Sequence, residues 1–162
     1  MSRSSSVHVQ RIYLDTSVLG GCHDAEFAPW SNGLLKDFRL GNYLPVVSEV
    51  VATEIEQAPE RVREVYADLI ASGAEVLSVT PEALRLADVY QERKILTSKF
   101  YDDGLHIALA STAAVGLLVS WNFKHIVHYD KIRYFNAVNL ELGYRSLAIY
   151  SPREVTHYGE ED

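Results

Sequence analysis

The sequence lacks several features that would each point to a particular class of protein. It has one cysteine, Cys22, which excludes an internal disulfide and a zinc site built on paired thiolates. Its longest apolar stretch, residues 113–119, is far shorter than the ~18 residues that a membrane-spanning helix needs. The opening MSRSSSVHVQ lacks the apolar segment of a secretory signal. These absences favour a cytoplasmic protein.

Positive charge is also scarce. The chain has 15 Lys and Arg residues against 22 Asp and Glu residues, a formal net charge of −7. This balance argues against a protein that binds nucleic acid through bulk basicity. Contact with phosphate through a bound divalent cation stays open, because the cation reverses the local charge.

The length of 162 residues suits one domain. A chain of this size buries roughly 68–70% of the surface that its unfolded form exposes. We find no repeat, no low-complexity block and no linker long enough to separate domains. We therefore expect a flexible tail over residues 1–6, a single domain over 7–155 and an acidic tail over 156–162.

Strand-like and helix-like segments alternate along the chain. The strand-like segments are 7–14, 44–47, 75–79 and 117–120, and then 137–142 and 145–150 as a final strand or strand pair. The helix-like segments are 32–40, 48–57, 61–71, one that starts at Thr80-Pro81-Glu82, and 103–114. A polar, Gly-rich turn follows the first strand. This alternation predicts an α/β fold with a parallel sheet covered by helices on both faces.

Four apolar runs each end on a side chain able to bind a metal or accept a proton. They are RIYLDTSVL around Asp15, VVSEVVATEIEQ around Glu54, YDDGLHIALA around Asp102 and Asp103, and LLVSWNFKHI around Asn122. An acid at the edge of core-forming sequence is costly unless a cation or hydrogen bonds compensate it. The four runs together predict one acidic pocket assembled by folding.

Asp15 and Glu54 each have an alternative interpretation. Asp15 ends the first strand, where open α/β sheets place their ligand crevices, and Thr16 and Ser17 beside it can hydrogen-bond a ligand. Alternatively Asp15 or Thr16 caps the next helix. Glu54 stacks below Val50 inside the apolar stripe of its helix, or it is an edge residue that reaches solvent.

The third and fourth runs are also ambiguous. Helical periodicity does not choose between Asp102 and Asp103, and one of them is alternatively the helix N-cap. His106 belongs to the pocket or is a hydrogen-bonded core histidine. Asn122 ligates a hard cation or orients a water, or it is a turn residue after a strand. Oxygen ligands without a Cys pair or a His pair favour Mg²⁺ or Mn²⁺ over zinc.

The same four strings resemble the PIN-domain family, which includes the VapC-type toxins of bacterial toxin–antitoxin pairs. The resemblance covers roughly residues 10 to 150. It rests on Asp15-Thr16-Ser17, the segment from Ser48 to Glu54, Asp103-Gly104-Leu105-His106-Ile107-Ala108, and Ser120-Trp121-Asn122-Phe123. LLVSWNFKHI is the most distinctive string and is similar to a subgroup with Asn where many members carry a fourth acid.

The resemblance implies a three-layer α/β/α fold and a metal-dependent ribonuclease site. By position, Asp15, Glu54 and Asp103 would be the catalytic acids at a Mg²⁺ or Mn²⁺ site, with Asn122 beside them as a further ligand. It selects Asp103 over Asp102, which would be a helix cap. Thr16, Ser17, Asp102 and His106 would be pocket neighbours. It also implies a small antitoxin partner and a homodimer.

RNA must also be held. The segment from Trp121 to Phe135 mixes basic and aromatic side chains that can contact phosphate and stack on unpaired bases. The candidates for RNA contact are Trp121, Lys124, His125, Lys131 and Arg133. Alternatively this segment is an ordinary surface loop anchored by its aromatic residues.

Two other functions compete with a ribonuclease. A phosphatase of the haloacid dehalogenase type also has a first strand that ends in Asp, but it needs an acid two residues later, where this chain has Ser17. A PIN-like module that has lost catalysis and binds RNA or protein is the stronger alternative. Divalent-metal binding separates it from a nuclease.

Overall fold

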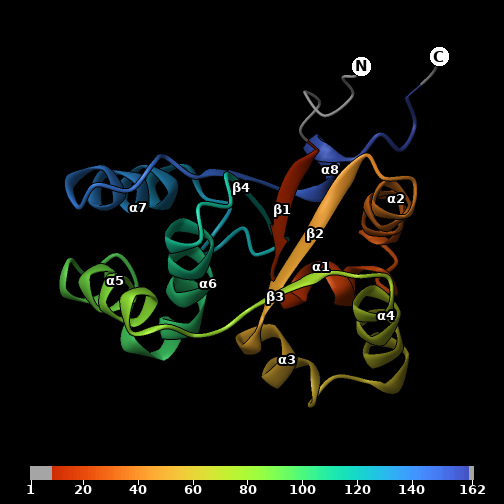
Figure 1. The fold of residues 1–162 in the computed structure, drawn as a ribbon, viewed down its shortest axis with the longest axis horizontal. Helices are drawn as coiled ribbons and strands as arrows, with labels where there is room; N and C mark the ends of the chain where they lie inside the picture. Colours follow the sequence, from red (N-terminus) through yellow and green to blue (C-terminus); the bar gives the residue numbers. More distant parts are fainter. Residues whose placement is uncertain (1–8, 161–162) are drawn as a thin grey trace, which may run out of the picture.

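A parallel five-stranded sheet is the centre of the computed structural model, which describes residues 9–160 (Figure 1). The strands are β1 (Gln10–Leu14), β2 (Tyr43–Ser48), β3 (Glu75–Leu77), β4 (Leu117–Val119) and β5 (Ala148–Tyr150). Their order is β3-β2-β1-β4-β5, and every neighbouring pair is parallel. The chain order reverses beside β1, so the crevice between the carboxyl ends of β1 and β4 is where such sheets bind ligands.

Helices cover both faces of the sheet. In Figure 1, α5, α6 and α7 lie on the left of the strands, and α1, α2 and α4 lie on the right. The predicted three-layer α/β/α arrangement is therefore confirmed. The helices are α1 (Thr16–Gly21), α2 (Ala28–Arg39), α3 (Glu49–Ile55), α4 (Glu60–Ala71), α5 (Pro81–Glu92), η2 (Ser98–Phe100), α6 (Tyr101–Thr112), α7 (Tyr129–Glu141) and α8 (Pro152–Val155).

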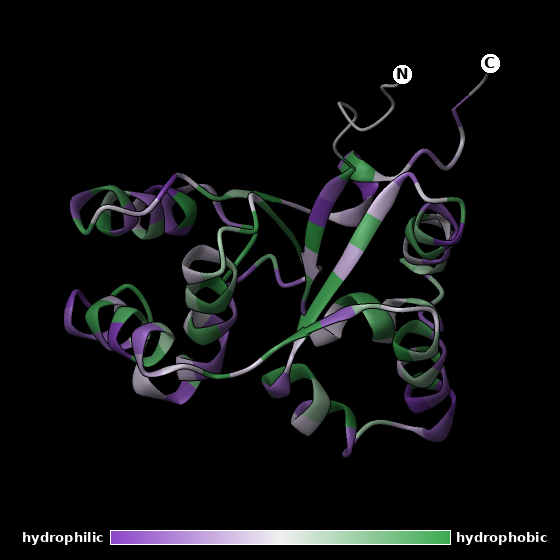
Figure 2. Ribbon diagram, viewed as in Figure 1, coloured by the Kyte–Doolittle hydropathy of each residue, from purple (hydrophilic) through white to green (hydrophobic). Residues whose placement is uncertain are grey.

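The core follows the apolar pattern of these elements. Ile12, Tyr13 and Leu14 of β1 are completely buried, and so are Val46 and Val47 of β2. Figure 2 shows hydrophobic segments in both strands. Helix α5 buries residues 83, 86, 87 and 90, the i, i+3, i+4, i+7 spacing of one helix face. Helix α6 is buried throughout residues 104–111, which makes it the central helix of its layer.

Two sequence expectations are wrong and one boundary is confirmed. Residues 137–142, expected as a strand, form the end of helix α7 and its C-cap, Leu142. The Gly-rich turn expected after Asp15 begins with the short helix α1. Helix α5 starts as expected, because Thr80 Oγ1 accepts a hydrogen bond from the Ala83 backbone N–H at 3.0 Å and Pro81 occupies the first helical position.

The ends of the chain are described only in part. The tail expected over residues 1–6 lies outside the described residues. At the other end, Thr156 Oγ1 and the His157 backbone N–H donate to Asp37 Oδ2 at 2.8 and 3.0 Å, so the start of the expected acidic tail contacts α2. Within residues 9–160 no helix has the length and apolar character needed to cross a membrane.

Candidate active site

Asp15 ends β1 and has a buried carboxylate with both oxygens engaged. The residue is 5% exposed. Its Oδ1 accepts a hydrogen bond from Ser17 Oγ at 2.6 Å, and its Oδ2 accepts one from Ser120 Oγ at 2.7 Å. Asp15 occupies the N-cap position of α1, but its carboxylate bonds these hydroxyls and not the helix backbone. Burial raises the pKa of Asp15, and the positive charge of His106 and the two hydroxyls oppose that rise.

The two serines join the carboxyl ends of β1 and β4. While each hydroxyl donates to Asp15, Ser17 Oγ accepts the Trp121 backbone N–H at 2.9 Å and Ser120 Oγ accepts the Asn122 backbone N–H at 2.9 Å. Each serine therefore uses its donor and an acceptor at once. Ser120 lay inside one of the quoted strings, but its contact with Asp15 spans 105 positions and had no signal in the sequence.

Glu54 approaches this edge from α3. Its Oε1 accepts hydrogen bonds from Thr16 Oγ1 at 2.6 Å and from His106 Nε2 at 3.0 Å, and its side chain is 33% exposed. Burial alone would raise the pKa of Glu54, but the bonds from His106 and Thr16 bring that pKa below its ordinary value. Glu54 is therefore an ionised carboxylate with one oxygen held.

The charges of all three acids affect the pKa of His106. Burial would lower the pKa of His106, but its hydrogen bond to Glu54 and the charges of Asp15, Glu54 and Asp103 raise that pKa overall. Its Nδ1 lies 2.7 Å from the Tyr13 hydroxyl. Of the two interpretations of His106 in the sequence, a core residue or a pocket residue, the structure combines both: it is a buried residue in contact with an acid of the site.

Asp103 lies in the first turn of α6, beside His125. Its Oδ2 is 3.1 Å from His125 Nδ1. Burial raises the pKa of Asp103, opposed by the positive charges of His106 and His125 and by a hydrogen bond from Asn122. The pairing with His125 was not foreseen, since the sequence suggested only an RNA contact for that histidine.

Asp102 does not cap α6. The N-cap is Phe100, so the cap role expected for Asp102 is wrong. Its side chain is exposed and lines a shallow pocket of about 240 Å³ together with Glu49 and Glu54. Asp102 therefore lies near Glu54, on the solvent side of the pocket.

Asn122 forms the turn after β4. Its Oδ1 accepts backbone N–H bonds from Lys124 at 3.2 Å and from His125 at 2.9 Å. A carbonyl oxygen has two lone pairs, so both are in use and none remains for a cation. The structure therefore favours the turn interpretation over the metal-ligand one, and Asn122 acts by bringing His125 against Asp103.

Two candidates for RNA contact, Trp121 and Lys131, make contacts within the protein. Trp121 is 8% exposed, and its ring stacks on Phe27 with centroids 4.1 Å apart. Its Nε1 donates to Ser31 Oγ at 2.8 Å. Lys131 Nζ donates to the Ile95 carbonyl at 2.6 Å. Both residues therefore stabilise the structure as it stands.

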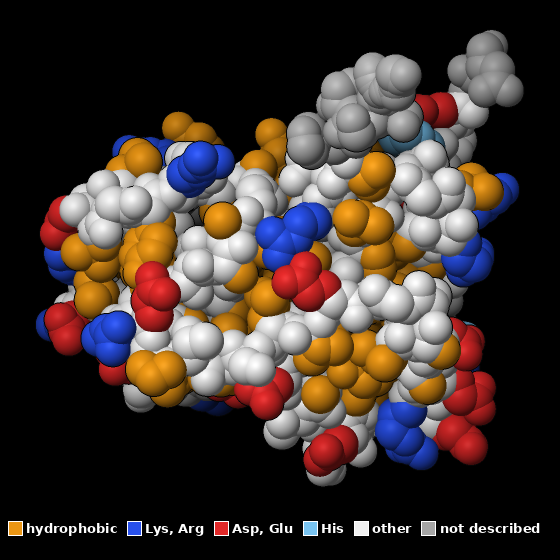
Figure 3. Space-filling model, in the orientation of Figure 1, with side chains coloured by type: hydrophobic (Ala, Val, Ile, Leu, Met, Phe, Trp, Pro, Cys, Tyr) orange, Lys and Arg blue, Asp and Glu red, His pale blue; other side chains and the backbone are white. Residues whose placement is uncertain are grey.

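Other side chains of the same segment, Phe123, Lys124 and Arg133, are exposed to solvent. Phe123 is 49% exposed and its ring centroid lies 6.1 Å from that of Trp121, while Lys124 is exposed beside it. Arg133 is exposed, with Nη1 3.3 Å from Asp130 Oδ1. On the face drawn in Figure 3, positive and negative side chains are interspersed among hydrophobic ones, in keeping with local contacts and not a broad basic surface.

The oxygen donors of the site are of the kind that bind hard cations. Within residues 9–160, no group of three His, Cys, Asp or Glu side chains stands close enough together to hold a metal ion. Mg²⁺, however, keeps several waters and usually takes only one or two carboxylates from the protein. Oε2 of Glu54 accepts no hydrogen bond from any described residue, because Thr16 and His106 both bond Oε1. The residues present therefore fit an ion bound by one or two carboxylates.

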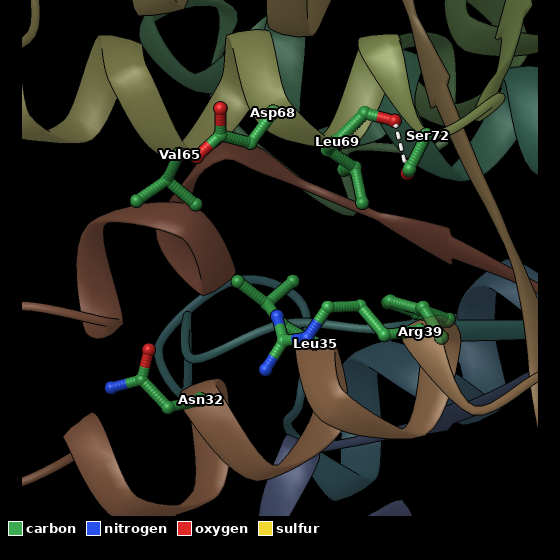
Figure 4. A pocket seen from close by; sticks show the side chains of 8 residues that line it. Asn32, Leu35, Arg39, Val65, Asp68, Leu69 and Ser72 are labelled. Carbon is green, nitrogen blue, oxygen red and sulfur yellow. Dashed lines mark hydrogen bonds between the residues drawn. The ribbon is translucent and has the colours of Figure 1, made fainter.

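A separate cleft lies between α2 and α4. Figure 4 shows Leu35 and Arg39 of α2 facing Val65 and Leu69 of α4 across a cavity of about 230 Å³. The acids of the sheet edge are not part of its lining. The candidate acids are thus at the carboxyl edge of the sheet and separate from this cleft.

The layers and strand order define a PIN-like α/β/α fold, and solved structures share it. Neither a family model nor a curated protein matches the sequence. The crystal structure of VapBC2 from Rickettsia felis, bound to a DNA fragment from their promoter, matches with a TM-score of 0.53 and 15% identity over 86% of this chain and 97% of that chain. Mycobacterium tuberculosis VapC20, a sarcin-ricin loop cleaving toxin, matches with a TM-score of 0.54 and 14% identity over 85% and 98%. The resemblance noted in the sequence is confirmed at the level of the fold.

Proposed function

We propose that this chain is a ribonuclease that hydrolyses RNA phosphodiester bonds with Mg²⁺ or Mn²⁺, and that it is the toxin of a type II toxin–antitoxin pair. The observation that carries the proposal is that Glu54 bonds both Thr16, the residue after Asp15, and His106, which lies on α6 with Asp103. These contacts lie beside the switch point of a sheet whose fold is that of VapC structures. One or two carboxylates are the usual protein contribution to a Mg²⁺ site, with water filling the remaining positions.

The three acids are each oriented by neighbouring side chains. Asp15, Glu54 and Asp103 would bind the cation directly or through its waters. When bound, such an ion lowers the pKa of a water molecule and offsets charge on a phosphate. Ser17 and Ser120 orient Asp15 and favour its ionised form. We assign the attack on the phosphate to a water molecule.

The RNA would reach the site past the exposed ring of Phe123. This ring is held at the edge of the Phe27–Trp121 stack, one residue from Asn122. Aromatic rings in such positions stack on unpaired bases of any sequence. Lys124 would contact phosphate. Lys131 and Arg133 stay candidates that would have to exchange Ile95 and Asp130 for phosphate, and Trp121 and His125 would act through packing.

A protein partner belongs to the same proposal. The Rickettsia felis structure is a VapBC complex with promoter DNA. We propose by analogy that a small antitoxin pairs with this chain in the cytoplasm, and that the chain forms a homodimer.

The test is cleavage of a mixed pool of single-stranded and structured RNA by the full chain. We expect cutting with Mn²⁺ or Mg²⁺, and none with EDTA or with Asp15→Asn. Asp102→Asn is the matched control, because Asp102 is an exposed acid next to Asp103 and should stay active. Cutting that survives in Asp15→Asn, or that is lost only in Asp102→Asn, would sink this assignment of the site.

A catalytically impaired PIN-like interaction module is the second candidate. It is favoured by Asn122, whose carbonyl oxygen is used within the turn, and by the pairing of Glu54 and Asp103 with histidines. Titration calorimetry with Mn²⁺ separates the two functions. A module need not bind the ion, whereas a nuclease with this site must bind it and must lose that binding in Asp15→Asn.

A further inference from the structure

A line of hydrogen bonds crosses the core and ends on Glu54. Ser48 Oγ lies 2.7 Å from the Tyr13 hydroxyl, which lies 2.7 Å from His106 Nδ1. His106 Nε2 lies 3.0 Å from Glu54 Oε1. Ser48 and Tyr13 are 0% exposed and His106 is 2% exposed. Polar groups buried this deeply must be paired, and this line pairs all of them.

The bond that ends on Glu54 has a fixed direction. A carboxylate only accepts, so His106 Nε2 carries a hydrogen and donates it to Glu54. Nδ1 accepts the Tyr13 O–H when the ring is neutral and donates to the Tyr13 oxygen when the ring is positively charged, and in both states Nε2 donates to Glu54. Ser48 Oγ also accepts the backbone N–H groups of Val50 and Val51 at 3.2 and 3.4 Å as the N-cap of α3.

Helix α3 is therefore tied to the same pair of rings at both ends. Ser48 precedes its first residue and Glu54 is its penultimate residue. The bonds from His106 and Thr16 both go to Oε1, so the carboxylate of Glu54 is fixed with Oε2 outward from them. A free glutamate would lose rotamer freedom on binding an ion, whereas this one has already lost it on folding.

We infer that His106 is a positioning residue, which occupies Oε1 of Glu54 and leaves Oε2 as the oxygen that meets a divalent cation. The inference rests on the proposed function, in which Glu54 belongs to the cation site. Burial excludes contact of His106 with RNA, so it acts through Glu54. Hydrogen-bond partners of this kind orient metal-binding carboxylates, and their loss commonly costs 10–100-fold in metal affinity.

The test is the affinity for Mn²⁺ alone, measured by the electron paramagnetic resonance signal of the free ion in the absence of RNA. We expect His106→Leu to weaken binding by about 10–100-fold. His106→Gln, whose amide N–H can replace Nε2, should restore most of it. Tyr13→Phe removes one hydroxyl and should give a smaller loss in the same direction.

Tyr90→Phe is the matched control for a lost buried hydroxyl. Tyr90 is 0% exposed and donates to Asn139 Oδ1 at 2.5 Å, away from the acids. It should leave Mn²⁺ affinity unchanged. Circular dichroism melts identify any variant that fails to fold, and Tyr13→Phe and His106→Gln keep the test decisive if His106→Leu is one of them.

The outcomes separate this inference from the proposed function. Unchanged or tighter Mn²⁺ binding in folded His106→Leu, or a loss that His106→Gln does not repair, overturns the positioning role alone. Wild-type binding of Mn²⁺ without RNA cleavage overturns the nuclease, while the His106 series still supports or refutes the positioning. A wild-type chain that binds no Mn²⁺ overturns both.

Discussion

Asp15 owes its buried, oriented carboxylate to two serine hydroxyls from different strand ends. The sequence proposed Asp15, Glu54 and the Asp102–Asp103 pair because each interrupts an apolar run, and a buried acid is costly. The family resemblance then selected Asp103. The sequence could not identify what holds them. The partners Ser120, His106 and His125 contact these acids across 105, 52 and 22 positions, and such pairs are set by the tertiary fold.

The ionisation of Asp15 should make the metal-free fold less stable as pH rises. Burial places its folded pKa above the ordinary 3.8, so the folded chain holds the proton more tightly than the unfolded chain. That stabilisation is complete below pH 3.8 and is lost as pH rises through the folded pKa. In EDTA, Asp15→Asn should therefore gain Tm over wild type near pH 7, by about 2–4 °C for each kcal/mol that burying the charge costs, with the gain shrinking toward pH 4.

Melting curves between pH 4 and 8 check this prediction. Asp68→Asn, an exposed acid on α4, is the control and should show no such trend. A gain in Tm that grows toward acid pH would contradict the direction of the Asp15 shift.

Phe123→Ala should weaken RNA binding without changing stability. The ring is 49% exposed, so little packing is lost. One stacked base contributes about 1–3 kcal/mol, which corresponds to roughly 5–150-fold in affinity. Fluorescence anisotropy with a labelled single-stranded RNA in EDTA measures it. Leu40→Ala, which removes a side chain that is 65% exposed just after α2, should bind like wild type, and so should Phe123→Tyr. Equal affinity of Phe123→Ala and wild type would rule out stacking on this ring.

Among the elements, helix α7 shows why the sequence pattern of residues 137–142 predicts a strand where the structure has a helix end. Residues 137–142, AVNLEL, alternate with the period of a strand when taken alone. The face that α7 buries is Phe135, Val138 and Asn139, at helical spacing. The buried Asn139 accepts from Tyr90 and donates to Ser111 Oγ at 2.8 Å, so a polar residue occupies a core position. The apolar pattern was broken by a hydrogen-bond network that only the fold brings together.

Asp37 anchors α2 to the end of the chain and should be important for stability. It is 3% exposed and accepts bonds from Asn42 Nδ2 at 3.0 Å, Thr156 Oγ1 at 2.8 Å and the His157 backbone N–H at 3.0 Å. Asp37→Ala leaves these donors without their acceptor, and each buried donor so left costs about 1–3 kcal/mol. Urea denaturation should show a loss of stability in that range, and Asp68→Ala should show almost none. RNA cleavage should survive in the part of Asp37→Ala that stays folded.

At the scale of the whole molecule, the fold class was predictable and the strand order was not. Alternating strands and helices favour a parallel sheet whatever its order. The order β3-β2-β1-β4-β5 depends on which side of β1 the fourth strand takes, and that choice is set by helix packing. It decides that Ser120, and not a residue after β3, lies beside Asp15.

Cation binding should stabilise the entire fold. A ligand that binds only the folded chain adds about 2.7 kcal/mol at 100 times its Kd. For a chain of this size that amounts to about 5–11 °C in Tm. Differential scanning fluorimetry should show such a rise with Mn²⁺, reversed by EDTA and absent from Asp15→Asn. A rise of the same size in Asp15→Asn would assign the bound ion to some other part of the surface.

The bond between Asp15 and Ser120 also has a consequence for protein synthesis. A ribosome adds roughly 5–20 residues per second, so Asp15 exists for several seconds before Ser120 is made. The central strand β1 likewise waits for β4, its partner on that side. A chain that ends between Asp103 and Leu117 thus carries all three acids but neither the Ser120 hydroxyl nor the strand β4. Only a chain extended past residue 120 has the parts that complete this arrangement.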